Sequence, residues 1–232
     1  MKIDTRVKTH IKGFDELILG GFPKNSNILI SGSAGTGKTI FSMQYLYNGA
    51  TIDNERGVYF TFEEKKESLI EQANQFGWEI EKLEKKEKIK IISIGTDDIS
   101  KNTVNDMIEI IKNTKSTRVV IDSITTLSFL TPESMQSGQI NNHTIKRFLY
   151  SFLTKFKEIP NLTVLFISQK DEKVSDEIAT YLCDGVINID YESLGGDFSR
   201  QLTIKKMRKT KNDEDLHPME ISNNGIVIHN LE

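Results

Sequence analysis

Hydrophobic residues fall into short runs of strand length, and stretches with helical periodicity separate these runs. Apolar runs bounded by polar or turn-forming residues predict strands at 27–31, 57–62, 89–94, 118–122 and 163–169. Between them, apolar residues that recur every three or four positions predict helices at 39–52, 66–76, 104–111 and 145–156. This alternation is typical of a parallel sheet with helices on both faces, so we predict an α/β fold.

The pattern changes beyond Gln169. Two strand-like runs at 184–192 and 199–207 are joined through Gly195-Gly196. A second pair of runs, at 219–221 and 225–228, turns through Asn223-Asn224-Gly225. Each pair predicts an antiparallel hairpin, and together they predict an antiparallel addition to the parallel sheet. The run 79–90, which is dense in Glu and Lys, is typical of a solvated helix and turn.

The composition is that of a globular protein, and the charge argues against one class of function. The 232 residues are 37% hydrophobic and 27% charged, which fits one domain over residues 1–232. A net charge of −3 lacks the basic excess typical of a sequence-independent nucleic-acid binder. No apolar stretch approaches the roughly 20 residues of a membrane helix and no signal peptide is visible, so we expect no membrane span. The single cysteine, Cys183, fits a reducing compartment, and we expect a cytoplasmic protein.

The segment Gly32-Ser33-Ala34-Gly35-Thr36-Gly37-Lys38-Thr39 matches the phosphate-binding pattern G-x-x-x-x-G-K-[ST] at every fixed position. It stands between a predicted strand and a predicted helix, which is the context that the motif requires and which argues against an incidental glycine-rich turn. Glycines let the loop turn its N–H groups inward, and Lys38 supplies a full positive charge to the terminal phosphates. Thr39 is expected to place its hydroxyl on Mg²⁺. The residues expected to contact the nucleotide here are Ser33, Ala34, Gly35, Thr36, Gly37, Lys38, Thr39 and Ile40.

Carboxylates stand at the ends of two other predicted strands. Asp122 ends one strand, where the carboxyl edge of the sheet brings it beside the phosphate loop, and we expect it to be a Mg²⁺ ligand. Glu63 and Glu64 follow an earlier strand, where a carboxylate can polarise the water that attacks the terminal phosphate. We therefore take Glu63, Glu64 and Lys38 as candidate catalytic residues, with Glu63 as the base. The structural alternatives are a turn cap for Asp122 and a charged helix start for the two glutamates.

Several further segments stand in a fixed order around the phosphate loop. They are Ile11-Lys12-Gly13-Phe14-Asp15-Glu16-Leu17 with Gly20-Gly21-Phe22-Pro23, Thr61-Phe62-Glu63-Glu64, Ile121-Asp122-Ser123-Ile124-Thr125-Thr126-Leu127, Asp184-Gly185-Val186-Ile187, Lys206-Met207-Arg208-Lys209-Thr210, and His217-Pro218-Met219-Glu220-Ile221 with Gly225-Ile226. With these segments in this order, the chain resembles the KaiC-like branch of the RecA superfamily of ATPases over nearly its whole length. The resemblance implies a RecA-like P-loop core with a mostly parallel sheet, flanking helices and antiparallel C-terminal strands, and it implies ATP and Mg²⁺ as ligands.

The resemblance also implies a homo-oligomer, usually a hexameric ring, with ATP bound between adjacent subunits. In the family a Lys and an Arg reach the γ-phosphate bound by the neighbour, and these roles fall here on Lys206 and Arg208, with Thr210 nearby. A guanidinium suits charge that develops on a transferring phosphoryl group, and strand alternation places Lys206 and Arg208 on one face. A solvated edge strand is the structural alternative. Gln169 occupies the place of a γ-phosphate sensor, although a satisfied strand-end amide is an equally good interpretation.

Some positions depart from the family pattern. Asn25-Ser26 and Lys209 stand where the family usually has a glycine. The clock protein of the family phosphorylates a Ser-Thr pair, which the stretch near Thr180-Tyr181 does not match, so the resemblance does not extend to autophosphorylation. The polar segment 130–144 corresponds to a loop that faces the ring channel in RecA relatives, and it is a candidate contact for a partner.

Three functions fit these observations. The first is a slow ATPase that acts as a switch in assembly or partner exchange. The second is a non-hydrolysing ATP-binding assembly module, like the ATPase-fold component of the archaeal motility machinery. The third is a recombinase-like DNA-binding paralogue, and the acidic balance and the lack of a separate DNA-binding domain count against it.

Overall fold

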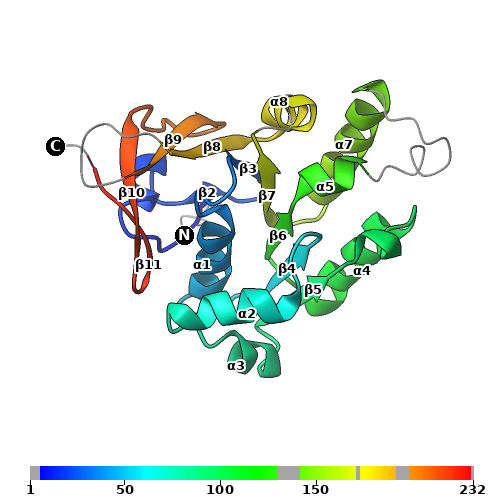
Figure 1. Ribbon diagram of the computed structural model, residues 1–232, viewed down its shortest axis with the longest axis horizontal. Helices are drawn as coiled ribbons and strands as arrows, with labels where there is room; N and C mark the ends of the chain where they lie inside the picture. The colour runs from blue at the N-terminus through cyan, green and yellow to red at the C-terminus, as the bar shows by residue number, and fades with distance from the viewer. Residues whose placement is uncertain (1–5, 130–141, 171–172, 192–198, 231–232) are drawn as a thin grey trace.

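A nine-stranded sheet forms the centre of the computed structural model, which describes residues 6–129, 142–170, 173–191 and 199–230 (Figure 1). Its strand order is β11-β10-β9-β8-β3-β7-β6-β4-β5. The strands from β8 to β5 in this order run parallel, and β9, β10 and β11 join antiparallel to one another and to β8. The strands are β3 (Asn27–Gly32), β4 (Gly57–Thr61), β5 (Ile89–Ser93), β6 (Arg118–Asp122), β7 (Thr163–Gln169), β8 (Gly185–Tyr191), β9 (Arg200–Met207), β10 (Leu216–Ser222) and β11 (Gly225–Ile228).

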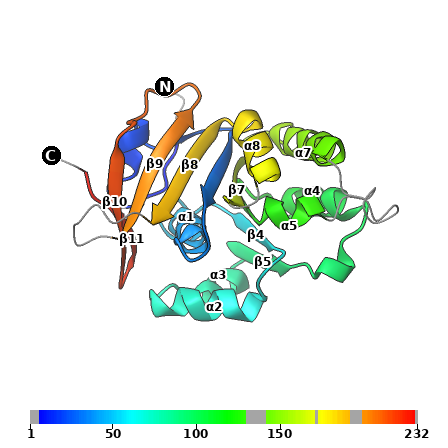
Figure 2. The ribbon, with the colours of Figure 1, turned by 45° about the horizontal axis from the view of Figure 1, so that its top comes forward.

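Helices cover both faces of the sheet (Figures 1 and 2). Helices α1, α2 and α3 pack into a core on one face, and α4, α5, α7 and α8 pack into a core on the other. The N-terminal segment adds a short antiparallel pair, β1 (Arg6–Val7) with β2 (Phe22–Pro23). The helices are α1 (Lys38–Thr51), α2 (Lys66–Gln75), α3 (Ile80–Lys85), α4 (Thr103–Thr114), α5 (Ile124–Phe129), α7 (Asn142–Lys157) and α8 (Lys173–Leu182), with 3₁₀ turns at Asp15–Ile18 and Thr96–Asp98.

The central strands read as continuous apolar runs because both of their faces are buried. In β3, Ile28 and Ile30 enter the core beneath α1, whereas Leu29 enters the core on the other face. The same alternation sends Leu165 of β7 to the first core and Phe166 to the second. The parallel α/β sheet and the antiparallel C-terminal strands that the sequence predicts are therefore confirmed.

Three differences from the prediction concern helices. Helix α5, at Ile124–Phe129, was not predicted. Helix α7 begins at Asn142, so residues 142–144 are helical rather than part of a loop, and residues 130–141 of that predicted loop lie outside the described residues. Helix α8 was not predicted. Its buried residues Ser175 and Ala179 carry small side chains, but Ile178 and Leu182, which are four residues apart, pack against the second core and gave a helical signal in the sequence.

Both departures from the family's glycines fall on unusual backbone. Asn25 has φ 57° and Lys209 has φ 60°, which is the left-handed region that favours glycine. Asparagine visits this region at little cost, whereas lysine does so less readily. At both positions this chain therefore adopts the left-handed conformation with a residue other than glycine.

Among the helices in the described ranges, none is both long and apolar enough to pass through a lipid bilayer.

Candidate functional site

The predicted nucleotide residues gather at the carboxyl edge of the parallel sheet. The strands β3, β7, β6 and β4 are consecutive neighbours. The phosphate loop follows β3, Gln169 ends β7, Asp122 ends β6 and Glu63 follows β4. Ligands of open α/β sheets bind at this edge, where loops from adjacent strands meet.

The phosphate loop has the conformation that its motif requires. Gly35 and Gly37 have φ values of 74° and 106°, and Lys38 begins α1 directly after Gly37. The buried Lys38 ammonium donates to the carbonyls of Gly32, at 2.8 Å, and Ser33, at 2.7 Å. A positive charge is thus fixed inside a loop at a helix N-terminus, which is the arrangement that binds the phosphates of a nucleotide.

A buried carboxylate lies beside this loop. Asp122 is 5% exposed, and its Oδ2 accepts hydrogen bonds from the hydroxyls of Thr39 at 3.1 Å and Tyr59 at 2.6 Å. Burial raises the pKa of Asp122 to about 6; hydrogen bonds from Tyr59 and Thr39 oppose this rise, and the nearby charges of Glu63 and Glu64 add to it.

The donor set fits a hard divalent cation. Mg²⁺ prefers oxygen ligands, and the Thr39 hydroxyl and the Asp122 carboxylate already lie within hydrogen-bonding distance of each other. When bound, Mg²⁺ supplies charge neutralisation for the terminal phosphates. These two residues are therefore the ones placed to hold it.

Glu63 lies at the centre of a hydrogen-bond network that joins three strand ends. Its carboxylate accepts from the Ser123 hydroxyl, from the Thr126 hydroxyl at 2.8 Å and from the Gln169 amide at 3.2 Å. Gln169 is fixed in turn, because its backbone N–H donates to the Thr125 hydroxyl at 3.0 Å. Glu63 is exposed, so its carboxylate is both oriented by these donors and accessible to water.

The adjacent Glu64 points elsewhere. Its carboxylate accepts from Ser68 at 2.9 Å and from Gln72 at 2.6 Å, both on α2. The Thr61 hydroxyl donates to the Glu64 carbonyl at 3.1 Å and accepts from the Glu64 N–H at 3.0 Å, which ties the turn after β4. The two predicted catalytic glutamates are thus separated: Glu63 faces the strand ends, and the Glu64 carboxylate is bonded to side chains of α2.

Lys206, Arg208 and Thr210 lie towards the amino ends of the parallel strands, at the opposite edge of the sheet from the phosphate loop. Gly185 pairs both with Ile28 in β3 and with Met207 in β9, so Arg208 lies level with the amino end of β3. The phosphate loop begins at Gly32, and the strand rise puts it about 13 Å further along β3. The fold therefore does not bring Arg208 to the phosphate loop of its own chain.

Helix α8 and the N-terminal segment hold these residues in place. Lys206 donates to the carbonyls of Thr180 at 3.0 Å and Tyr181 at 3.2 Å, and Arg208 pairs with Asp184 at 3.3 Å. Burial and the charge of Arg208 lower the pKa of Lys206. Arg6 donates to the Thr210 hydroxyl at 2.6 Å, which fixes the loop after Arg208.

The sequence prediction did not identify several residues at the carboxyl edge of the sheet, near the phosphate loop. Ser123 follows Asp122 directly and Thr126 comes three residues later, and hydroxyls close to a predicted metal ligand are the signal that was available. The Tyr191 hydroxyl donates to the Gly35 carbonyl at 2.6 Å and accepts from Arg200 at 3.0 Å. Nothing in the sequence indicates this contact, because it depends on β8 lying next to β3.

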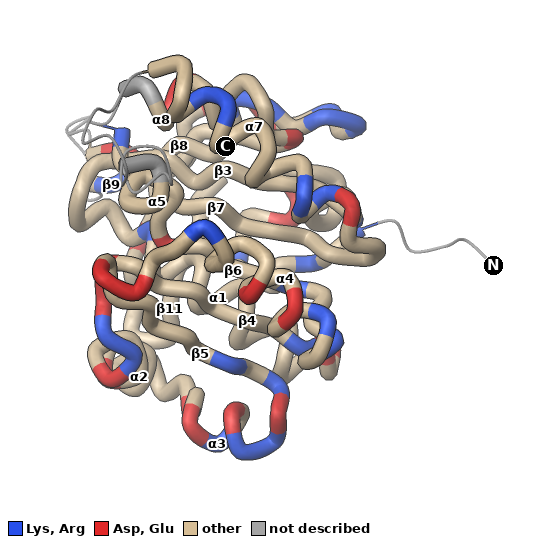
Figure 3. Tube along the Cα trace, turned by 90° about the vertical axis from the view of Figure 1, so that its right-hand side faces the viewer, with Lys and Arg blue, Asp and Glu red and all other residues tan. Residues whose placement is uncertain are grey.

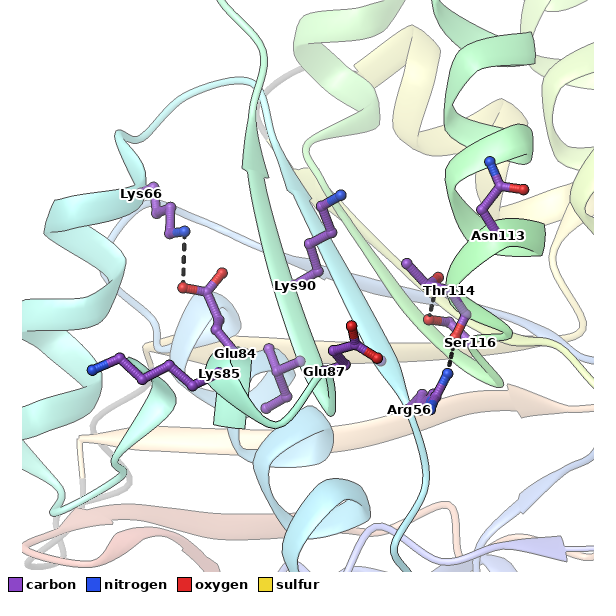
Figure 4. A pocket seen from close by; sticks show the side chains of 11 residues that line it. Arg56, Lys66, Glu84, Lys85, Glu87, Lys90, Asn113, Thr114 and Ser116 are labelled. Atoms are coloured by element: carbon purple, nitrogen blue, oxygen red, sulfur yellow. Dashed lines mark hydrogen bonds and ion pairs between the residues drawn. The ribbon is translucent and has the colours of Figure 1, made fainter. Parts of the chain in front are cut away.

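A separate hollow of about 510 Å³ lies at the amino ends of β4 and β5, away from the phosphate loop (Figure 4). Its charged lining is mixed, with Lys66 paired to Glu84 at 2.8 Å. Acidic and basic positions are likewise interspersed along α3 beside it (Figure 3). The residues that line it are Arg56, Gly57, Lys66, Glu84, Lys85, Glu87, Ile89, Lys90, Asn113, Thr114 and Ser116, none of which belongs to the phosphate loop.

Known proteins are similar to this chain over nearly its whole length. A family model described as the KaiC ATPase matches residues 7–232. A UPF0273 protein of Thermotoga maritima is 34% identical over 98% of this chain and 97% of its own, and one of Sulfurisphaera tokodaii is 34% identical over 96% and 82%. The crystal structure of a KaiC-like protein of Pyrococcus horikoshii superimposes with a TM-score of 0.81 at 33% identity, covering 97% of this chain and 99% of that one. The chain therefore belongs to the KaiC family of ATPases, within the RecA-like P-loop superfamily.

Proposed function

We propose that this protein hydrolyses ATP with Mg²⁺, slowly, as a switch, and that each active site is completed by a second copy of the chain. The observation that carries the first part is the placement of Glu63, an exposed carboxylate oriented by Ser123, Thr126 and Gln169, on the same sheet edge as Lys38 and Asp122. Placement of a carboxylate base beside a phosphate loop is the requirement for in-line attack by water.

Each residue has a distinct role in this proposal. The phosphate-loop amides and Lys38 bind and orient the β- and γ-phosphates, and Thr39 and Asp122 hold Mg²⁺. Glu63 positions the attacking water and accepts its proton, while Gln169 links the γ-phosphate position to Glu63. Because three donors already orient the carboxylate, little ordering remains to be done at the moment of attack.

The second part rests on the position of Lys206 and Arg208. Their edge of the sheet is remote from the phosphate loop of the same chain, so they act on a nucleotide only if that nucleotide is bound by another copy. A guanidinium supplied from a neighbour stabilises the charge of the transition state and makes turnover depend on assembly. We propose a head-to-tail ring, with six copies as the family resemblance implies.

The two glutamates provide a matched test of the catalytic part. In Glu63→Gln, phosphate release under saturating ATP and Mg²⁺ should fall at least about 100-fold, while ATP still binds, because the base is lost and the phosphate loop is intact. Glu64→Gln changes the adjacent carboxylate, which accepts hydrogen bonds from Ser68 and Gln72 of α2, and should keep turnover within a few-fold. Equal turnover of the Glu63→Gln variant and the wild type would remove Glu63 from the mechanism. A wild type that binds ATP and releases no phosphate would favour the non-hydrolysing assembly module.

A further inference from the structure

One contact holds the phosphate loop from a neighbouring strand. The Tyr191 hydroxyl donates to the Gly35 carbonyl at 2.6 Å, and Tyr191 is the last residue of β8, the strand next to β3. The carbonyls of Gly32 and Ser33, by contrast, accept from Lys38, which belongs to the loop's own helix. The Gly35 contact therefore ties the loop to a part of the sheet that the proposed roles in catalysis do not include.

Arg200 fixes the direction of this hydrogen bond. It is the first residue of β9 and pairs with Tyr191, the last residue of β8. Its guanidinium lies 5.0 Å from the centre of the Tyr191 ring and donates to the Tyr191 hydroxyl at 3.0 Å. Because a guanidinium only donates and a carbonyl only accepts, the hydroxyl hydrogen goes to Gly35. The positive charge also polarises the hydroxyl, which makes it a stronger donor.

The contact determines which way one peptide group of the loop points. Gly35 has a φ of 74° and lacks a Cβ, so the peptide plane that follows it can turn over at little steric cost. The Gly35 carbonyl and the Thr36 N–H share that plane, and in a trans peptide they point in opposite directions. When the carbonyl is held on the Tyr191 side, the Thr36 N–H therefore points away from Tyr191.

We propose that Tyr191, oriented by Arg200, is a positioning residue that keeps the phosphate loop ready for the phosphates of a nucleotide. Its hydroxyl holds the Gly35 carbonyl away from the ligand, so the Thr36 N–H faces the phosphates before they arrive. A carbonyl turned the other way would place a partial negative charge against an anion. Binding then does not have to order this peptide group. The proposal rests on the proposed function for nucleotide binding alone, and it does not depend on hydrolysis.

Removal of the hydroxyl alone tests this role. Tyr191→Phe keeps the ring beside Arg200, and its affinity for ATP and for inorganic triphosphate should fall by about 3- to 10-fold in calorimetric titrations with Mg²⁺. Both losses should be equal, because the contact acts on the phosphates. A tyrosine that served only to stack on the base would leave the affinity for inorganic triphosphate unchanged, and this result would overturn the proposal.

Two further measurements separate positioning from a role in stability. The amide NMR resonance of Thr36 should move in ligand-free Tyr191→Phe, because the adjacent carbonyl loses its donor. Thermal unfolding should match that of the wild type, since the Tyr191 side chain is half exposed and its ring is kept. A lower unfolding temperature with an unmoved Thr36 resonance would overturn the proposal.

The part played by Arg200 is tested by a double variant. Arg200→Met removes the donor to the Tyr191 hydroxyl and should lower the affinity for both ligands by a smaller factor than Tyr191→Phe does. The double variant Tyr191→Phe/Arg200→Met should bind no more weakly than Tyr191→Phe, because Arg200 acts through the hydroxyl. Losses that multiply in the double variant would show that Arg200 acts independently and would overturn its role as the orienting group.

Tyr150→Phe is the matched control, because it removes a tyrosine hydroxyl at the other end of β3. Tyr150 is 61% exposed and lines a cavity with Asn27, which begins β3, whereas the phosphate loop follows the end of that strand. This variant should bind both ligands like the wild type. Unchanged affinity of Tyr191→Phe, or a wild type that binds neither ligand, would overturn the proposal. A wild type that binds both and releases no phosphate would overturn the proposed hydrolysis and leave the role of Tyr191 standing.

Discussion

Strand β6 has a buried charged residue at each end, and within the part of the chain that the structure describes only the residue at its amino end is paired with groups of opposite charge. Arg118 at the amino end is 1% exposed and fully partnered. It donates to the carbonyl of Tyr45 at 3.0 Å, to Asp53 at 2.7 Å and to Glu55, and its guanidinium lies 4.7 Å from the centre of the Tyr45 ring. Asp122 at the carboxyl end is almost as buried, yet its bonds come from neutral hydroxyls.

The difference separates a structural charge from a functional one. At the amino end, two carboxylates compensate one guanidinium, so the group stabilises the folded chain and is closed to ligands. At the carboxyl end, no described cation pairs with the Asp122 carboxylate, and its raised pKa is the mark of that deficit. A bound cation would remove the deficit, which is why an uncompensated buried carboxylate beside a phosphate loop is a candidate metal ligand.

Removing the compensated charge of Arg118 should have the largest effect on stability. Arg118→Met leaves the buried Tyr45 carbonyl without its donor, and it leaves Asp53 and Glu55, whose side chains are each 30% exposed, without their cation, so the free energy of unfolding should fall by about 2–4 kcal/mol. Urea unfolding followed by circular dichroism measures this. ATP affinity of the folded fraction should be unchanged, since the site lies at the other end of the strand. A loss below about 1 kcal/mol would contradict the structural role.

Removing the uncompensated charge of Asp122 should instead increase the free energy of unfolding. The pKa of Asp122 is higher in the folded chain than the ordinary 3.8, so ionisation opposes folding. Without metal and nucleotide, Asp122→Asn should therefore raise the free energy of unfolding at pH 8 by up to about 3 kcal/mol. This gain should shrink as the pH falls below 6, because the wild-type carboxyl group becomes protonated there. Urea titrations at several pH values, with a chelator present, measure this gain in the free energy of unfolding. A gain that does not change with pH, or a loss of stability at pH 8, would contradict the assignment.

A smaller effect is expected from removing one hydrogen bond to the Asp122 carboxylate. Tyr59→Phe removes one of the hydroxyl donors to Asp122 and keeps the buried ring. The pKa of Asp122 should rise further, and the free energy of unfolding at pH 8 should fall by about 1 kcal/mol. A carboxyl-carbon NMR titration of the metal-free protein follows the pKa directly. An unchanged or lower pKa in this variant would show that the hydroxyl does not support the charged form.

Much of the fold and part of the site were predictable because their signals are local. The phosphate loop is a contiguous motif, and the strands around it are contiguous apolar runs, so the positions of Lys38, Thr39 and Asp122 at one edge followed from the sequence. The partners of Glu63 did not, because Ser123 and Gln169 meet it only through the order of β4, β6 and β7 in the sheet.

Other features depend on contacts that a linear pattern does not encode. Arg118 opens an apolar strand and carries no sign of its burial, since its partners Asp53 and Glu55 lie in a loop before another strand. The different directions of Glu63 and Glu64 are set by the turn after β4. That Arg208 lies far from its own phosphate loop also depends on strand register.

Mixing two inactive variants tests the central claim, that the catalytic parts of one site come from two copies. Glu63→Gln lacks the base and Arg208→Ala lacks the guanidinium, so each should release phosphate slowly when alone. In a one-to-one mixture, a complete site forms where the Arg208→Ala variant supplies Glu63 and the Glu63→Gln variant next to it supplies Arg208. Random assembly gives this order at about a quarter of the contacts, so phosphate release should recover to about a quarter of the wild-type rate. A mixture no more active than its components, while the variants co-assemble, would contradict the shared site.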